Sequence, residues 1–182
     1  MKKIIYIVLA VLLVGVIGYV LYETLIVARR SPKETVTFND RGLDLKVVYC
    51  RPYKKGRLIF GEEKDKALLP YGKYWRLGAN AATEITFSKN ATFAGKPVSA
   101  GTYRMYAVPG PDAFQISLNS ELGVAAAHNE PDYTKDVLKT DIAVQKIPET
   151  EQLTIAFSSD AQAVNMDIIW DQNQIRIPII PQ

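Results

Sequence analysis

The sequence predicts an all-β domain, an antiparallel β-sandwich or a flattened barrel, preceded by one N-terminal transmembrane helix. After residue 34, apolar and polar residues alternate with a period of two, which is typical of strands with one buried and one solvated face. Glycine and proline turn signals separate these runs at short intervals. No long segment after residue 30 has a helical period, so crossover helices are not expected, and closely spaced antiparallel strands remain.

The N-terminal segment is apolar enough to cross a membrane. Residues 4–22 form a run of 19 residues without a charge, and a helix needs about 20 such residues to span the hydrocarbon core. The alternative is a cleaved signal peptide, but its apolar region is shorter, about 7–15 residues, and ends in a small-residue cleavage site that is not found here. We therefore expect residues 1–30 to be a retained membrane anchor, with a helix at about 4–28.

The charges on the two sides of this helix are nearly balanced, so they give only a small preference for one orientation in the membrane. Lys2 and Lys3 favour a cytoplasmic N-terminus, whereas Arg29, Arg30 and Lys33 favour the opposite arrangement. Two lysines followed at once by the apolar run resemble an export signal. The expectation is a single-pass membrane protein whose soluble domain faces outward, in the periplasm or another extracytoplasmic space.

Residues 31–182 are expected to form a single β-sandwich domain, because about 100–200 residues suffice for one core. A weak helical segment is expected at 121–127, and Trp170 is expected in the core. Strands are predicted near 35–39, 43–50, 83–89, 91–98, 102–108, 113–119, 136–147, 152–158, 162–170 and 174–179.

The charge of this domain argues against nucleic-acid binding. Residues 31–182 contain 18 basic and 18 acidic residues, whereas a domain that neutralises phosphates shows a basic excess. The charges are unevenly placed, with ten Lys or Arg against four acids in 41–76, and eleven acids against three Lys in 112–171. Contact between the two segments would pair these charges.

Few residues are suited to metal binding or catalysis. Cys50 is the only cysteine and His128 the only histidine, so neither a disulfide nor a histidine-rich metal site is expected. No nucleophile elbow, phosphate-binding glycine loop, HExxH or CxxC motif is present. We expect no cofactor and no metal, and we expect binding in preference to enzymatic activity.

Residues 51–82 interrupt the strand pattern. This segment, RPYKKGRLIFGEEKDKALLPYGKYWRLGANAA, is the longest irregular stretch and holds most of the basic excess. Long ordered loops on a β scaffold frequently carry the binding residues.

Three motifs resemble an uncharacterised bacterial family catalogued as domain of unknown function twenty-nine-eleven. They are RPYKKGRLIFG, PYGKYWRLGANAAT and AGTYRMYAVPG, and the resemblance covers nearly all of the soluble part. It implies an N-terminal export signal, as members of the family typically have one, but no particular activity.

The candidate ligand site combines basic, aromatic and amide side chains of this irregular segment. Guanidinium groups grip carboxylate or phosphate through paired hydrogen bonds, and aromatic rings add a stacking surface. In the alternative, structural interpretation, the arginines bind loop carbonyls and acids while Trp75 packs in the core. The predicted ligand-binding residues are Arg51, Lys55, Arg57, Tyr71, Trp75, Arg76 and Asn80.

Two functions follow from these residues. In the first, a membrane-anchored domain of the cell envelope binds a small anionic or sugar-like ligand, such as an anionic small molecule or a glycan. In the second, the domain is an interaction module that docks onto an envelope protein complex.

Overall fold

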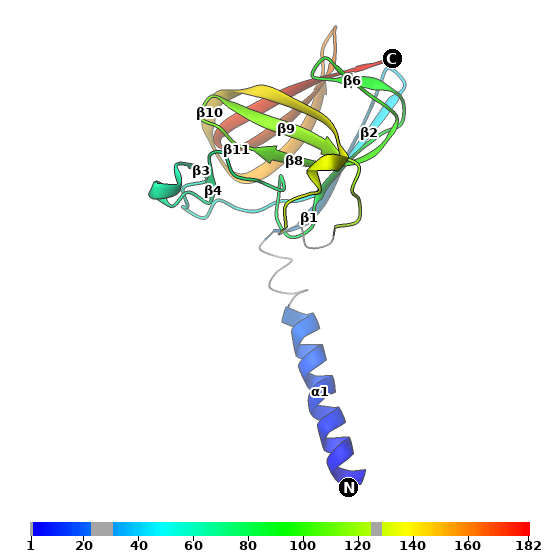
Figure 1. The fold of residues 1–182 in the computed structure, drawn as a ribbon, viewed down its shortest axis with the longest axis vertical. Helices are drawn as coiled ribbons and strands as arrows, with labels where there is room; N and C mark the ends of the chain where they lie inside the picture. Colours follow the sequence, from blue (N-terminus) through cyan, green and yellow to red (C-terminus); the bar gives the residue numbers. More distant parts are fainter. Residues whose placement is uncertain (1, 23–30, 125–128) are drawn as a thin grey trace.

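The computed structural model describes residues 2–22, 31–124 and 129–182. Helix α1 (Lys2–Tyr22) is followed by a β domain, and Figure 1 shows the helix standing apart from that domain. Its mean hydropathy is 2.9 over the most apolar window and none of its residues is buried. By length and composition it can span a membrane, a property shared by anchors and signal sequences.

Nine strands form one antiparallel sheet in the order β1-β2-β5-β8-β9-β10-β11-β6-β7. A separate two-stranded parallel ribbon consists of β3 (Phe60–Gly61) and β4 (Leu69–Pro70), with a 3₁₀ turn, η2 (Glu63–Asp65), between them. A second 3₁₀ turn is η3 (Tyr133–Lys135). The sheet strands are β1 (Lys33–Asp40), β2 (Leu43–Cys50), β5 (Thr83–Phe87), β6 (Ala91–Phe93), β7 (Lys96–Val98), β8 (Gly101–Val108), β9 (Ala113–Asn119), β10 (Asp136–Ser159) and β11 (Val164–Pro181).

The large sheet folds over on itself and does not close into a barrel. The first part of β10 pairs with β9, and its second part pairs with β11, so this strand turns the corner between two layers. Side chains of strands that share no hydrogen bonds meet across the core, such as Phe87 of β5 and Phe93 of β6, whose ring centroids lie 6.2 Å apart. The all-β, sandwich-like prediction is therefore confirmed (Figure 1).

The faces that the alternating sequence pattern predicts to be buried are buried in the structure. In β2, Leu43, Leu45 and Val47 are at most 1% exposed, while Asp44 and Lys46 between them are exposed. In β11, Met166 and Trp170 are at most 2% exposed, which confirms Trp170 as a core residue. Burial of such side chains is the main source of stability for a fold of this kind.

Three predicted strand divisions and part of one predicted helix were wrong. The run 91–98 is two strands joined by a two-residue turn, in which Ala94 and Gly95 have φ of 51° and 79°. The pairs 136–147 with 152–158, and 162–170 with 174–179, are single strands, because register shifts and the positive φ of Asp171 bend them without ending them. Residues 121–124 are not helical; the rest of the expected helix, 125–127, lies outside the described residues, as does His128.

Candidate functional site

The irregular segment 51–82 folds back on itself, which brings its two motifs together. Backbone amides of the second half donate to carbonyls of the first: Leu68 to Leu58 at 2.9 Å, and Leu69 to Ile59 at 2.8 Å. Trp75 then fixes this ribbon to the sheet by two 2.8 Å backbone hydrogen bonds with Ala107 of β8. The motifs that are separate in sequence therefore become two walls of one structure.

Close backbone contact under the ribbon explains one glycine of the second motif. A Cβ at Gly78 would lie 2.8 Å from the Cys50 carbonyl oxygen and 3.3 Å from Thr83 Oγ1. A larger residue would push the second wall away from the end of β2.

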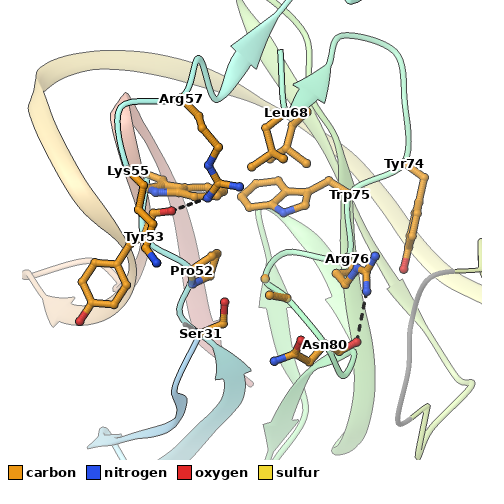
Figure 2. Close-up of a pocket in the computed structure, with 14 residues that line it drawn as sticks. Ser31, Pro52, Tyr53, Lys55, Arg57, Leu68, Tyr74, Trp75, Arg76 and Asn80 are labelled. Atoms are coloured by element: carbon orange, nitrogen blue, oxygen red, sulfur yellow. Dashed lines mark hydrogen bonds between the residues drawn. The ribbon is translucent and has the colours of Figure 1, made fainter. Parts of the chain in front are cut away.

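Between these walls lies a solvent-open cleft of about 840 Å³ (Figure 2). Five of the seven predicted site residues line it, whereas Arg51 and Tyr71 do not. The lining combines cations, aromatic rings and small or apolar residues: Ser31, Pro52, Tyr53, Lys55, Arg57, Leu68, Leu69, Tyr74, Trp75, Arg76, Gly78, Ala79, Asn80 and Trp170.

Two tryptophans lie at the base of the cleft. The rings of Trp75 and Trp170 stack with centroids 6.0 Å apart at 27°, and both are at least 97% buried. Phe60 meets both rings edge-on, so this pair is part of the core as well as of the cleft. The indole Nε1 of Trp170 donates to the Glu151 carbonyl at 3.4 Å, whereas Nε1 of Trp75 is buried without an acceptor among the described residues.

Three cations surround this aromatic base. Figure 2 shows Lys55 and Arg57 on one side of Trp75, with Arg76 and Asn80 on the other. Arg57 donates from Nε to the Lys54 carbonyl at 2.9 Å and from Nη2 to the Tyr53 carbonyl. Arg76 donates from Nη1 to the Asn80 carbonyl at 3.2 Å. For Arg57, these carbonyls hold the guanidinium group in place without neutralising its charge.

Among the described residues that line the cleft, none carries a carboxylate. Within the described part of the chain, neither Lys55 nor Arg57 forms an ion pair, and the Lys55 ammonium has no hydrogen-bond partner. Burial lowers the pKa of the Arg76 guanidinium, and the nearby Arg104 cation lowers it further. Lys55 and Arg57 therefore contribute positive potential to the cleft.

Arg51 and Tyr71 have structural roles. The Arg51 guanidinium donates to Glu34, to the Leu153 carbonyl at 3.0 Å and to Thr154 Oγ1 at 2.9 Å, so it joins β1 to β10. Tyr71 packs against the core, and burial, followed by Glu62 and Asp112, raises its pKa. For these two residues the structural interpretation describes the contacts that are present.

The acidic segment 112–171 forms ion pairs with only part of the basic segment 41–76. Lys54 Nζ lies 2.7 Å from both Glu149 and Asp171, and hydrogen bonds to these two carboxylates raise its pKa. Lys55 and Arg57, one and three residues further on, remain unpaired among the described residues.

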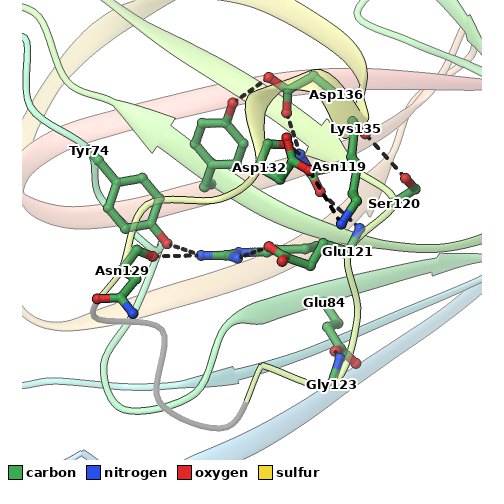
Figure 3. Close-up of polar contacts among 12 residues, drawn as sticks. Tyr74, Glu84, Asn119, Ser120, Glu121, Gly123, Asn129, Asp132, Lys135 and Asp136 are labelled. Atoms are coloured by element: carbon green, nitrogen blue, oxygen red, sulfur yellow. Dashed lines mark hydrogen bonds and ion pairs between the residues drawn. The ribbon is translucent and has the colours of Figure 1, made fainter.

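A buried arginine behind the cleft was missed by the sequence analysis. Arg104 of β8 is 1% exposed and donates to Glu121 and to the Tyr74 hydroxyl, each at 2.6 Å, and to the Asn129 carbonyl at 3.2 Å. Figure 3 shows Tyr74, Glu121 and Asn129 converging on this point. Its sequence signal was a lone charge inside the strand motif AGTYRMYAVPG. Arg104 fixes Tyr74, which forms one edge of the cleft.

Cleft residues outside the motif segment were missed as well. Ser31 precedes the first strand, and Trp170 lies far beyond the motif segment 51–82 in the sequence. Only the tertiary fold brings these two residues to the cleft. Among the described residues, no group of three or more metal-ligating side chains is found.

The fold and the cleft define a class of protein: an antiparallel β domain behind one apolar N-terminal helix, with a basic and aromatic cleft on a ribbon beside the sheet. Residues 31–179 match the family described as "Protein of unknown function (DUF2911)". The chain belongs to this family, which confirms the resemblance of its motifs. No curated protein matches the chain, and no solved structure does.

Proposed function

We propose that this protein is a membrane-anchored domain of the cell envelope that binds a small anionic ligand in the cleft between the two motifs. The observation that carries this proposal is the composition of the lining: its described residues include three cations and no carboxylate. Clustered like charges favour an anionic partner, because that partner reduces their mutual repulsion.

The arrangement of Arg57 supports binding of an oxyanion. Its Nε and Nη2 are held by the Lys54 and Tyr53 carbonyls, while Nη1 has no hydrogen-bond partner among the described residues. A guanidinium held in this way loses little conformational freedom when a ligand binds. Lys55 offers three further donors in the same cleft.

The lining favours binding over catalysis. Its described residues include no Asp, Glu, His or Cys side chain, the groups that most often act as general bases or nucleophiles. An aromatic base and an amide such as that of Asn80 are common features of pockets that bind small ligands.

The outward orientation belongs to the same proposal. Helix α1 is long and apolar enough to span a membrane, and its start, two lysines followed by an unbroken apolar run, is the order found in export signals.

Ligand binding is tested with the full chain in detergent, by thermal unfolding in phosphate, citrate and uronic acids at constant ionic strength. We expect at least one anion to raise the melting temperature in a saturable manner, because a ligand that binds only the folded state stabilises it. Arg57→Gln should abolish most of that shift. Lys64→Gln, which removes an exposed charge of the same ribbon outside the cleft, should retain it. Equal shifts in both variants would contradict a specific site.

A further inference from the structure

The cleft has an apolar rim as well as a basic one. Leu58 is 46% exposed and Leu68 is 41% exposed, and the backbone hydrogen bond from Leu68 to the Leu58 carbonyl holds the two next to each other. Leu68 also lines the cleft, together with Leu69 and Pro52. A small, fully hydrophilic anion would satisfy the cations and leave this apolar surface in water.

The segment that contains the β3–β4 ribbon is basic outside the cleft as well. Residues 55–76 contain six Lys or Arg and three acids. Exposed leucines surrounded by lysine and arginine are the combination that binds an anionic bilayer surface, where basic residues contact headgroups and apolar residues reach the acyl region.

The chain itself keeps the cleft near the membrane. Ser31 lines the cleft and follows Tyr22, the last residue of α1, by nine positions. Nine residues span at most about 30 Å when fully extended. With α1 in a bilayer, the cleft wall therefore stays within that reach of the helix end, and lipids of the same membrane are its most concentrated amphiphilic anions.

The geometry points to an anionic phospholipid of the anchoring membrane as the ligand, with its phosphate at Lys55, Arg57 and Arg76. The glycerol backbone and the first acyl carbons lie against Leu68 and Leu58. This inference rests on the proposed function and on α1 being embedded in the bilayer. It adds that the ligand carries an apolar part and comes from the membrane, not from solution.

The two tryptophans allow a direct test in the intact chain. The chain has only two tryptophans, Trp75 and Trp170, and both lie at the cleft, so the tryptophan fluorescence reports on this site alone. The full chain is placed in nanodiscs whose lipids carry brominated acyl chains, which quench nearby indoles. We expect several-fold stronger quenching with phosphatidylglycerol than with phosphatidylcholine.

Matched variants separate the cleft from general surface attraction. Arg57→Gln should lose most of the phosphatidylglycerol-dependent quenching, while Lys64→Gln should keep it. Equal loss in the two variants would mean that the ribbon only adsorbs to charged lipid. Quenching that is the same in both lipids would overturn the inference as well.

A second arm distinguishes this inference from the function on which it rests. Glycerol phosphate or inorganic phosphate is added to the full chain in detergent free of phospholipid, and thermal unfolding is followed. Stabilisation that depends on Arg57, together with absent quenching in lipid, would keep the proposed function and reject the lipid. If phosphate has no effect and lipid does not quench, both proposals fall.

Discussion

Lys55 occupies a backbone position that usually carries asparagine or glycine. Lys55 and Gly56 have φ of 52° and 67°, and the Arg57 amide donates to the Lys54 carbonyl at 3.1 Å, which are the features of a type I′ turn. Glycine adopts this conformation without strain, but lysine does not. A strained residue that also presents an unpaired charge to a cleft suggests that stability has been exchanged for binding.

Replacement of this lysine should therefore separate stability from binding. We expect Lys55→Asn to raise the free energy of unfolding by up to about 1 kcal/mol, because asparagine tolerates positive φ, and to weaken the anion-dependent rise in melting temperature. Urea unfolding and thermal unfolding measure the two effects.

Lys66 provides the control for that substitution. It also has a positive φ, 58°, and is exposed on the same ribbon, but it does not line the cleft. Lys66→Asn should stabilise similarly and leave the anion effect intact. A loss of the anion effect in Lys66→Asn would assign it to the ribbon as a whole.

Sequence alone could not separate Arg51 from Arg57. Both are arginines of the same motif, six residues apart, but Arg51 follows β2 directly and meets the Glu34 carboxylate, while Arg57 follows the type I′ turn and meets only carbonyls. The difference depends on which strands are neighbours, β1 and β10 in this case, and local sequence does not contain that information.

The two arginines should respond differently to truncation. Arg51→Ala is expected to lower the free energy of unfolding by about 1–3 kcal/mol, because it leaves the partly buried Thr154 hydroxyl and Leu153 carbonyl without their donor. Arg57→Ala should cost less than about 0.5 kcal/mol, as expected for an exposed side chain. Urea unfolding compares them, and equal losses would assign Arg57 a structural role too.

At the scale of elements, the long strands β10 and β11 connect the two layers of the sheet. Each was predicted as two strands, because residues 148–151 and 171–173 are polar and look like loops. In the structure the two long strands bend at these places and continue, with Thr150 paired to Asp171 between two register shifts. Bulges of this kind depend on pairing with a strand that is distant in sequence. The alternation of apolar and polar residues therefore predicted where strands lie, but not that two predicted strands form one continuous strand.

Asp160 secures the connection between these two strands. Its carboxylate accepts from the amides of Gln162 and Ala163 and from the Asn165 side chain, at 2.7, 3.0 and 2.7 Å. These hydrogen bonds lower its pKa from the ordinary 3.8 to about 2. The ionised form is thus favoured by folding, and its contribution is present above about pH 4 and lost as the pH falls toward 2.

The turn should therefore contribute to acid sensitivity. Asp160→Asn is expected to be less stable than the wild type at neutral pH, with a difference that shrinks between pH 5 and pH 2. Thermal unfolding across this range tests it. A difference that stays constant down to pH 2 would contradict the assignment.

At the scale of the whole molecule, the sequence predicted the fold class and the position of the apolar helix. Both depend on periodicity and composition, which are local properties. The cleft depends on Ser31, the ribbon and Trp170 meeting in space, and only its central part was predictable from residues 51–82.

Membrane topology remains a prediction of the whole chain. We expect α1 to be retained, so the protein should stay in the membrane fraction after alkaline carbonate extraction. A reporter fused after Gln182 should be active only on the extracytoplasmic side. A shortened, soluble product would identify residues 2–22 as a cleaved signal, and a cytoplasmic reporter signal would reverse the orientation.

The position of Ser31 has a mechanical consequence. Ser31 is a wall of the cleft, and Pro32, the next residue, accepts a 2.8 Å hydrogen bond from the Arg51 amide. If α1 is embedded in a bilayer and the membrane moves away from the domain, the tension reaches this wall and that hydrogen bond before it reaches the β1–β2 pairs. Pulling on the anchor therefore deforms the cleft sooner than the sheet, and we expect the grip on a ligand to weaken under force while the fold survives.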